Sequence, residues 1–282
     1  MTDTSELQRL KAENEALRAE LDETNHGVLA LYAELDNQAE ELRQASDLKS
    51  RFLSYMSHEF RAPLGSILSM TRLLSDGLDG PLSDEQQKQV HLVSSAAREL
   101  SDMVDDLLDL TKIEAGRITI SPAWFDMIDL FSALRGMFRP IADMTSADLV
   151  FEDLKDIPRL YTDDKKLTQI LRNYISNALK FTPKGEVRVY AAMENANEVR
   201  FAVRDTGIGI PLDQQGELFK DFNQIQSPLQ KRYRGTGLGL SLCRRFAELL
   251  GGRVGMSSFP GEGSEFHVVL PIKLSEEAAH AG

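Results

Sequence analysis

The sequence predicts an α + α/β protein with three parts: an N-terminal coiled coil, a dimeric four-helix bundle built from two helical hairpins, and a C-terminal α/β sandwich. Three observations carry this prediction. Apolar heptads run through the first 45 residues, a second helical pattern follows a Gly-Pro turn near residue 80, and short alternating strands interleave with helices after residue 117. We therefore expect segments at 1–45, 46–117 and 118–275, followed by a tail at 276–282.

The composition is that of a globular protein of one or two domains plus an extension. Of its 282 residues, 42% are hydrophobic and 27% are charged. The formal net charge of −12 opposes binding to nucleic acid or to anionic membranes, because like charges repel at long range. Cys243 is the only cysteine, which excludes an intrachain disulfide and a thiolate metal cluster. The sequence shows no secretory signal and no run of about 18 apolar residues, so we expect a cytoplasmic protein without membrane insertion.

The first 45 residues carry the heptad pattern of a coiled coil. Asn14 at an a position is a polar insertion of the kind that fixes register and favours two parallel strands. A single amphipathic helix packed on its own domain is the alternative, and six heptads flanked by charged residues make it the weaker one. The a positions are Leu7, Asn14, Leu21, Val28, Leu35 and Leu42, and the d positions are Leu10, Leu17, Thr24, Leu31, Gln38 and Ala45.

A helical hairpin is expected next. Its first helix stops at the glycines and proline of residues 77–81. Ser83, with Gln86 three residues later, forms the capping box of a second helix that ends near Gly116. Each helix buries only one side, so a single hairpin has too small a core to be stable alone. Dimerisation into a four-helix bundle supplies that core, and the coiled coil supports the dimer.

The first hairpin helix carries His58 in the stretch "SHEFRAPL". A neutral imidazole is a nucleophile, and Glu59 could hold its opposite ring N–H. The alternative is a solvated surface histidine beside an incidental kink, since Pro63 cannot donate to the Glu59 carbonyl and weakens the helix there. His58 lies about 180° around the helix from Ile67, away from the face that we expect to point into the bundle core. That face comprises Phe52, Met56, Phe60, Pro63 and Ile67.

The C-terminal segment predicts a separate α/β domain large enough for its own core. Alternating stretches at 186–193 and 198–205, separated by "ENAN", indicate a β-hairpin. Helical patterns near 128–145, 164–181 and 238–251 interleave with the strands. One of these helices carries a stripe of two amides and an ammonium, which suits a metal-bound polyphosphate. The stripe consists of Asn173, Asn177 and Lys180 at positions i, i+4 and i+7.

Two glycine-rich stretches extend this phosphate-site pattern. Asp205 ends a strand in "DTGIGI", where Gly207 and Gly209 let the backbone approach a ligand. In "RGTGLGLSL" three glycines come directly before a helix whose free N–H groups and dipole bind phosphate. A tight turn explains any one glycine pair, whereas all three motifs in this order and spacing are a strong signal. The three glycines are Gly235, Gly237 and Gly239.

From about residue 46 to residue 272 the chain resembles the two-component sensor histidine kinases. "SHEFRAPL" is similar to their H box, "NYISNALKF" to the N box, "DTGIGI" to the G1 box, "LFKDFNQI" to the F box and "RGTGLGL" to the G2 box. The resemblance implies an ATP-binding domain shared with gyrase- and chaperone-type ATPases, with ATP and Mg²⁺ as cofactors. It also implies an ATP-dependent histidine autokinase that donates the phosphoryl group to an aspartate of a separate response regulator.

The resemblance assigns roles to individual residues. His58 is the phosphorylated residue and Glu59 its assisting base. Asn177, with Asn173, is the Mg²⁺ ligand, and Asp205 accepts a hydrogen bond from the adenine amino group. Further nucleotide contacts are implied for Lys180, Gly207, Gly209, Gly235, Gly237 and Gly239, and for Lys231, Arg232 and Arg234 of a mobile lid at 220–234.

Two other classes of function compete with this one. A scaffold that binds ATP but signals by conformation or recruitment conflicts with the intact His58, Asn177 and Asp205. An ATPase or serine kinase of the same superfamily conflicts with Asn173, because the related ATPases carry a glutamate there to activate water and an amide is no base.

The implied partners are a second copy of the chain, a response regulator receiver domain, and an upstream sensor protein at the coiled coil, with no nucleic acid. Ala62 departs from the family pattern. Members that also dephosphorylate their regulator commonly carry threonine or asparagine four residues after the histidine, where the side chain can align water. Alanine has neither donor nor acceptor, so we expect a kinase-biased enzyme with weak phosphatase activity.

Overall fold

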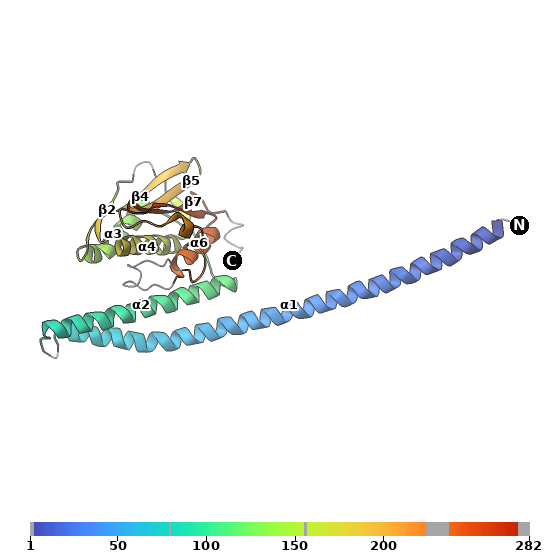
Figure 1. Ribbon diagram of the computed structural model, residues 1–282, viewed down its shortest axis with the longest axis horizontal. Coiled ribbons are helices and arrows are strands. Elements are labelled where there is room, and N and C mark those ends of the chain that lie inside the picture. Colours follow the sequence, from blue (N-terminus) through green and yellow to red (C-terminus); the bar gives the residue numbers. More distant parts are fainter. Residues whose placement is uncertain (1–2, 79, 155–156, 224–236, 276–282) are drawn as a thin grey trace. The chain divides into compact units, whose positions relative to one another are not determined.

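The computed structural model of the chain describes residues 3–78, 80–154, 157–223 and 237–275 (Figure 1). Its contacts divide the chain into two units, Met1–Phe52 and Leu53–Gly282. Within the described ranges, every helix is too short or too polar to span a lipid bilayer.

Helix α1 (Asp3–Ser75) begins in the first unit and continues into the second. In the first unit, the apolar seam residues whose side chains the structure describes are exposed within that unit. The exposed seam residues are Leu17, Leu21, Val28, Leu31, Leu35 and Leu42.

A helical hairpin opens the second unit, as predicted. Helix α2 (Asp84–Glu114) starts with the predicted capping box. The Gln86 backbone N–H donates to Ser83 Oγ at 3.3 Å, and the Ser83 N–H donates to Gln86 Oε1 at 2.9 Å. Both bonds satisfy amides that the first helical turn leaves without partners, which fixes where α2 begins.

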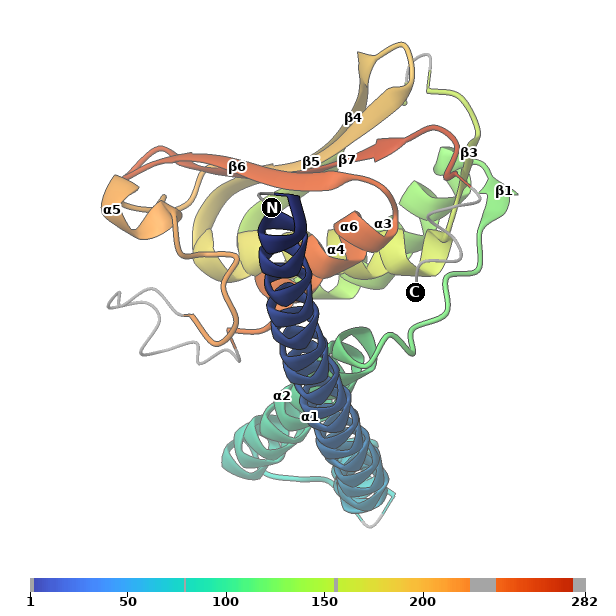
Figure 2. The same cartoon turned by 90° about the vertical axis from the view of Figure 1, so that its right-hand side faces the viewer.

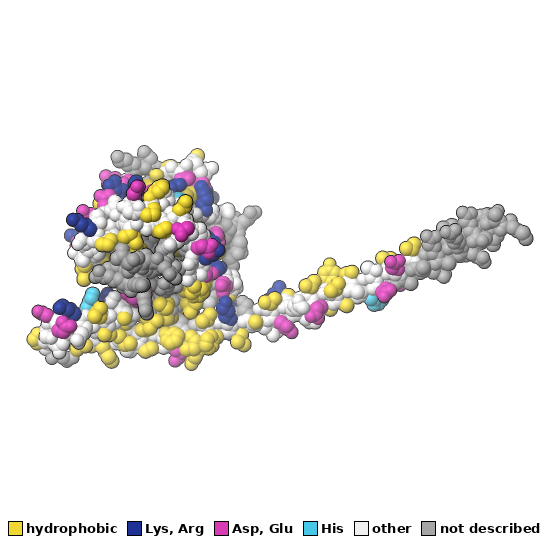
Figure 3. Space-filling view, in the orientation of Figure 1, with side chains coloured by type: hydrophobic (Ala, Val, Ile, Leu, Met, Phe, Trp, Pro, Cys, Tyr) yellow, Lys and Arg dark blue, Asp and Glu magenta, His cyan; other side chains and the backbone are white. Residues whose placement is uncertain are grey.

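Within one chain, α1 uses a face beside the predicted core stripe to form the hairpin. Ser57, Leu64 and Thr71 are buried, and their seven-residue spacing places them on one line along α1. Phe60 and Ile67, which belong to the predicted stripe, remain 48% and 38% exposed. Both helices of the hairpin therefore carry uncovered hydrophobic side chains, which Figure 3 shows gathered along them.

The C-terminal region is a two-layer α/β sandwich, which confirms the predicted fold class. Its main sheet has the order β2-β4-β5-β7-β6, in which β2 and β4 are parallel and the other pairs are antiparallel. Figure 2 shows helices α3, α4 and α6 covering one face of this sheet. The elements are β1 (Ala123–Phe125), α3 (Met127–Ala142), β2 (Ser146–Phe151), β3 (Leu160–Thr162), α4 (Asp164–Phe181), β4 (Lys184–Asn195), β5 (Glu198–Asp205), α5 (Leu212–Gln215), α6 (Gly239–Leu249), β6 (Arg253–Phe259) and β7 (Gly263–Pro271).

The β-hairpin of β4 and β5 and the three longer helices were predicted, whereas the small antiparallel sheet of β1 and β3 was not. Helix α4 sits at the centre of the core because one whole side of it is apolar. The α4 residues on this side are 7% exposed or less: Leu167, Ile170, Leu171, Tyr174, Ile175, Ala178 and Leu179.

The start of α4 is fixed by one buried carboxylate. Asp163 Oδ1 accepts hydrogen bonds from the backbone N–H groups of Lys165 and Lys166, each at 3.1 Å. Its other oxygen, Oδ2, accepts from the Ser121 N–H at 2.9 Å. Asp163 thus caps α4 and also holds the chain segment that follows α2.

An acidic stretch of α2 packs against the sandwich. Gln169 Nε2 on α4 donates to Asp109 Oδ2 at 2.8 Å, and Leu110 of α2 belongs to the sandwich core. Burial raises the pKa of Asp106 to about 7, and the neighbouring carboxylates of Asp102 and Asp109 act in the same direction. Arg172 on α4 opposes this shift.

This raised pKa predicts how stability depends on pH. An aspartate whose pKa is higher in the folded than in the unfolded state favours folding at low pH, and that contribution is lost as the pH rises toward about 7. Asp106→Asn cannot ionise, so its free energy of unfolding should gain on that of the unmodified protein between pH 5 and pH 8. Because one pKa unit corresponds to about 1.4 kcal/mol, the gain should exceed ~1 kcal/mol.

Denaturant unfolding followed by circular dichroism at several pH values measures this difference. Asp148→Asn is the control, because Asp148 is exposed on the edge strand β2 and is not among the charges that shift the pKa of Asp106. A pH-independent difference between Asp106→Asn and the unmodified protein would contradict the assignment.

Candidate active site

The polar stripe of α4 lies beside its buried face, as predicted. Asn177 Nδ2 donates to Asn173 Oδ1 at 3.0 Å, so the two amides form one unit. This bond uses the nitrogen of Asn177 and leaves its oxygen as the atom that can bind a further partner. Amide oxygens belong to the oxygen-donor class that suits Mg²⁺, so the pair fits the predicted metal.

Lys180 lies one turn further along the same stripe and is partly buried. Burial lowers the pKa of its ammonium group, and the carboxylate of Glu99 on α2 acts against that shift. A partly desolvated ammonium group interacts more strongly with an anion than one in open water. Its position at the C-terminal end of the stripe suits a contact with phosphate.

Asp205 ends β5, as predicted, and its side chain is buried. Its Oδ1 accepts hydrogen bonds from the backbone N–H of Gly207 at 2.8 Å and of Ser264 at 3.3 Å. Burial raises the pKa of this carboxyl group, whereas the two amide donors and the Thr182 hydroxyl act in the opposite direction. The two bonds hold the acceptor in a fixed orientation.

A second buried polar atom lies beside this carboxylate. Thr182, which follows α4 directly, is fully buried, and its hydroxyl lies close enough to the Asp205 carboxylate to lower the pKa of that group. A Cβ built on Gly207 would lie 2.9 Å from Thr182 Oγ1 and 2.3 Å from the Phe181 carbonyl oxygen, so the loop after β5 lies directly against the end of α4. A buried carboxylate next to a hydroxyl fits a ligand edge that both donates and accepts, as adenine does.

The G2 glycines that the structure describes bring a helix N-terminus to the same stripe. Gly239 is the first residue of α6, and a Cβ there would lie 2.0 Å from Asn173 Nδ2. Gly237 has a φ of +72°, and a Cβ there would lie 2.8 Å from the Phe222 carbonyl carbon. Among the described residues, no side chain caps the start of α6, and a helix N-terminus of this kind can bind an anion.

These contacts bring together residues that are far apart in the sequence. Asn173 touches the start of α6, and the end of α4 touches the loop that holds Asp205, Gly207 and Gly209. His58 and Glu59 are exposed on α1, and no hydrogen bond or ion pair among the described residues joins them to this group or to each other. The predicted Lys231, Arg232, Arg234 and Gly235 lie outside the described residues, as does most of the predicted lid.

Sequence reasoning missed two contributors to the site. Thr182 carries a weak signal, because it follows the polar helix directly, but its burial depends on how the β5 loop approaches. The Ser264 N–H that donates to Asp205 comes from β7 and has no signal, since any residue except proline offers the same backbone group.

Two protein families match the chain. Residues 48–116 match the His Kinase A (phospho-acceptor) domain. Residues 162–274 match the family described as histidine kinase-, DNA gyrase B-, and HSP90-like ATPase. The first match contains His58, and the second contains the α4 stripe and Asp205.

Individual relatives agree with these families. The autoinducer 2 sensor kinase/phosphatase LuxQ of Vibrio parahaemolyticus is 36% identical over 242 residues, which are 84% of this chain and 28% of LuxQ. The sensor protein GacS of Pseudomonas syringae is 37% identical over 249 residues, 86% of this chain and 27% of GacS. The crystal structure of full-length ShkA in complex with AMPPNP is 32% identical with a TM-score of 0.63, and the match covers 78% of this chain and 45% of ShkA.

This chain spans about a third or less of the length of these curated relatives. The families, the relatives and the sandwich fold agree along both the helical hairpin and the α/β region. The chain belongs to the two-component sensor histidine kinases.

Proposed function

We propose that the chain is an ATP-dependent kinase that phosphorylates its own His58 and then donates the phosphoryl group to an aspartate of a response regulator. The observation that carries this proposal is the convergence on α4, where the Asn173–Asn177 pair, Lys180 and the Asp205 loop form one polar site. The similar ShkA structure is a complex with AMPPNP, which supports a nucleotide as the ligand here. Because the reaction consumes ATP, we assign it to the cytoplasm.

Each part of the site has a task toward Mg²⁺-ATP. Asp205 accepts from the adenine amino group, and the Thr182 hydroxyl completes that edge. Asn177, with Asn173, holds Mg²⁺, and Lys180 contacts phosphate. ATP supplies the phosphoryl group, and Mg²⁺ neutralises phosphate charge. Gly207 and Gly209 allow close approach, and the phosphates rest on Gly235, Gly237 and Gly239 with Lys231, Arg232 and Arg234.

His58 acts as the nucleophile. One ring nitrogen forms a bond to the γ-phosphorus while the bond between that phosphorus and the β,γ-bridging oxygen breaks, and ADP departs with the electron pair. Glu59 takes the proton released by the ring. His58 is exposed, so a phosphoryl group held on another surface can reach it.

Asn173 favours transfer over hydrolysis. Its side-chain oxygen accepts from Asn177, and an amide cannot remove a proton from water. This argues against an ATPase. The complete set of site residues argues against a scaffold that does not catalyse.

Incubation with radiolabelled ATP tests the proposal through two variants, one expected to lose the phosphorylated residue and the other expected to lose nucleotide affinity. His58→Gln should bind nucleotide normally but carry no acid-labile label. Asp205→Asn should lose nucleotide affinity by at least about tenfold, because the amide offers a donor where an acceptor is needed and hydrogen bonds to charged groups contribute ~1.5–3 kcal/mol. Its labelling should fall in parallel.

Acid treatment identifies the product, since phosphohistidine is acid-labile and phosphoserine is not. His91→Gln is the control for the other histidine of the hairpin and should keep the label. Acid-stable label, or label that survives in His58→Gln, would point to a different reaction or a different acceptor.

We also propose that the chain is a homodimer. The exposed stripe that includes Phe60 and Ile67 and the exposed heptads of α1 are both explained if a second copy covers them. Sedimentation should show a dimer at micromolar concentration, and Phe60→Asp with Ile67→Asp should weaken it. Deleting residues 1–45 should weaken the dimer without abolishing it. A monomer at that concentration would exclude this assembly.

An upstream sensor protein would act on the dimer through the coiled coil.

Ala62 makes the enzyme kinase-biased in this proposal. The residue is exposed one turn after His58, and a methyl group cannot align water. Ser66, one turn further, does not replace it, because its hydroxyl donates to the Ala62 carbonyl at 3.1 Å. The relative LuxQ is named as a kinase/phosphatase, so this chain's own balance needs a direct measurement.

Phosphorylated regulator mixed with the protein and ADP provides that measurement. The unmodified chain should dephosphorylate the regulator little faster than the regulator hydrolyses alone, and Ala62→Thr should be faster. Ala62→Ser is a control for the hydroxyl without the extra methyl group. Equal and rapid dephosphorylation by the unmodified chain and Ala62→Thr would show that Ala62 has no such effect.

A further inference from the structure

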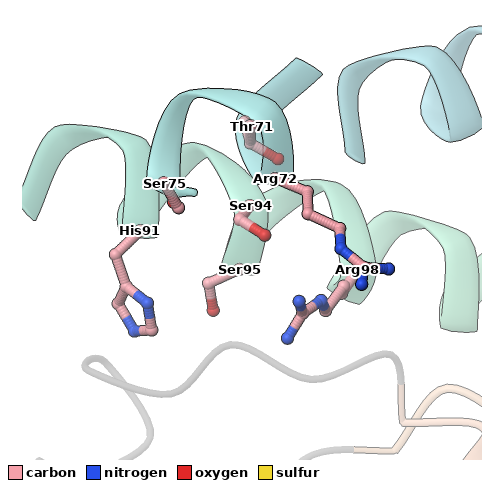
Figure 4. A pocket seen from close by; sticks show the side chains of 7 residues that line it. All are labelled: Thr71, Arg72, Ser75, His91, Ser94, Ser95 and Arg98. Carbon is pink, nitrogen blue, oxygen red and sulfur yellow. The ribbon is translucent and has the colours of Figure 1, made fainter. Parts of the chain in front are cut away.

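Arg245 on α6 is shielded from water more than Arg72 of the helical hairpin. Figure 4 shows Arg72 and Arg98 at a polar pocket of about 210 Å³ between α1 and α2. The Arg72 side chain is 83% exposed, so water screens its charge. The Arg245 side chain is 24% exposed, and its charge therefore acts more strongly on the groups around it.

Arg245 forms an ion pair with Asp221, which lies in the F-box stretch that follows α5. The Arg245 Nη2 donates to Asp221 Oδ2 at 2.8 Å, and the Asp221 side chain is 30% exposed. Burial raises the pKa of Asp221, but the Ser241 hydroxyl and the charges of Arg245 and Arg244 act in the opposite direction, and the net shift of the pKa is downward. The Asp221 side chain is therefore a charged carboxylate at neutral pH.

The turn that carries Asp221 has a constrained backbone. Asn223 Nδ2 donates to the Glu217 carbonyl across the turn at 2.7 Å. Phe222 has a φ of +60°, in the left-handed region that bulky residues rarely adopt. The carbonyl oxygen of Asn223 would lie 2.9 Å from a Cβ built on Gly237, so the turn lies against the residues that lead into α6. Such a backbone persists where the surrounding contacts hold it, and the ion pair of Asp221 is one of these contacts.

The Asp221 carboxylate lies beside the first turn of α6 but does not cap it. Ser241, whose hydroxyl shifts the pKa of Asp221, is the third residue of α6, and Arg245 follows one turn later on the same face. At 1.5 Å per residue, Arg245 lies about 9 Å along the helix from Gly239. A carboxylate near a helix N-terminus is attracted to the N–H groups there, yet no described side chain caps α6. The ion pair holds this anion at the side of the helix.

We propose that Arg245 is a positioning residue for the nucleotide: by binding Asp221, it keeps this carboxylate from capping α6 and leaves the N-terminus of the helix to the phosphates. The proposal rests on the nucleotide site proposed above. Without Arg245, an unpaired carboxylate next to the helix end would take N–H groups that the phosphates need and would repel the phosphates. The adenine edge at Asp205 does not involve this pair, so the pair acts on the affinity for phosphate and not on the affinity for adenine.

Nucleotide binding by the full chain tests this proposal. Calorimetric titration with AMPPNP and Mg²⁺ measures the binding of adenine and phosphates together, and competition by adenosine measures the binding of the nucleoside alone. Arg245→Gln should bind AMPPNP at least about fivefold more weakly, as expected for an unpaired charge at a partly buried helix end, and should bind adenosine as the unmodified protein does. The KM for ATP in autophosphorylation should rise by a similar factor, with kcat changed by less than about twofold.

Removal of the competing carboxylate separates this role from a structural one. Asp221→Asn combined with Arg245→Gln should bind AMPPNP to within about twofold of the unmodified protein, because no unpaired charge remains. Asp221→Asn alone should bind AMPPNP at least as tightly as the unmodified protein, and Arg245→Lys, which keeps the positive charge, should bind it nearly as tightly. If the ion pair served only to hold the turn, the double variant would bind AMPPNP as weakly as Arg245→Gln.

Arg253→Gln is the matched control. It breaks an arginine–carboxylate pair of the same sandwich, in which Arg253 Nη1 lies 2.5 Å from Glu198 Oε1, but on β6. Its affinities for AMPPNP and adenosine should equal those of the unmodified protein.

The outcomes separate the two proposals. If the unmodified protein does not bind AMPPNP, the nucleotide site proposed above fails. If it binds AMPPNP, but Arg245→Gln binds it equally well or loses affinity for adenosine to the same extent, only the role of Arg245 is wrong. A fivefold loss of AMPPNP affinity in Asp221→Asn would also contradict that role, because this variant has no carboxylate to compete with phosphate.

Discussion

The burial of one side of α4 is the constraint on which the rest of the site depends. The apolar side chains of this helix lock its rotation against the sheet, and that rotation decides which way Asn173, Asn177 and Lys180 face. Three to four residues separate the polar positions, so a helix turned by one residue, about 100°, would change which way the two amides and the ammonium group face. The Asp205 loop contacts the C-terminal end of α4, and the start of α6 contacts Asn173 on the same helix. The hydrophobic core therefore positions the polar chemistry.

The helical hairpin differs from the sandwich, because a single chain leaves part of the hairpin's apolar surface exposed. The sandwich closes its own core, while the hairpin has adjacent apolar stripes and covers one of them. The side of α1 that carries His58 is exposed in the single chain. The hairpin thus buries one stripe against its own second helix and leaves the other for the second copy that we propose.

The sequence predicted most of what depends on short-range periodicity. The bounds of α4, the capping box at Ser83 and the strand end at Asp205 all follow from residue spacing, and all were confirmed. The pairing of β1 with β3 was not predictable, because each strand has only three residues and the partners are 35 residues or more apart. The hairpin's buried line through Ser57 was also missed, since adjacent stripes have the same seven-residue repeat and only packing selects between them. Thr182 and the Ser264 amide depend on loop approaches that no local pattern encodes.

Asp163 joins two parts of the protein through a single carboxylate. One oxygen closes the first turn of α4, and the other holds the backbone of Ser121 in the segment that leaves α2. The side chain is only 3% exposed, so water cannot readily replace either set of bonds. A pull on the segment after α2 therefore acts directly on the first turn of α4. This residue therefore couples the segment that leaves the hairpin to the helix that carries Asn173, Asn177 and Lys180.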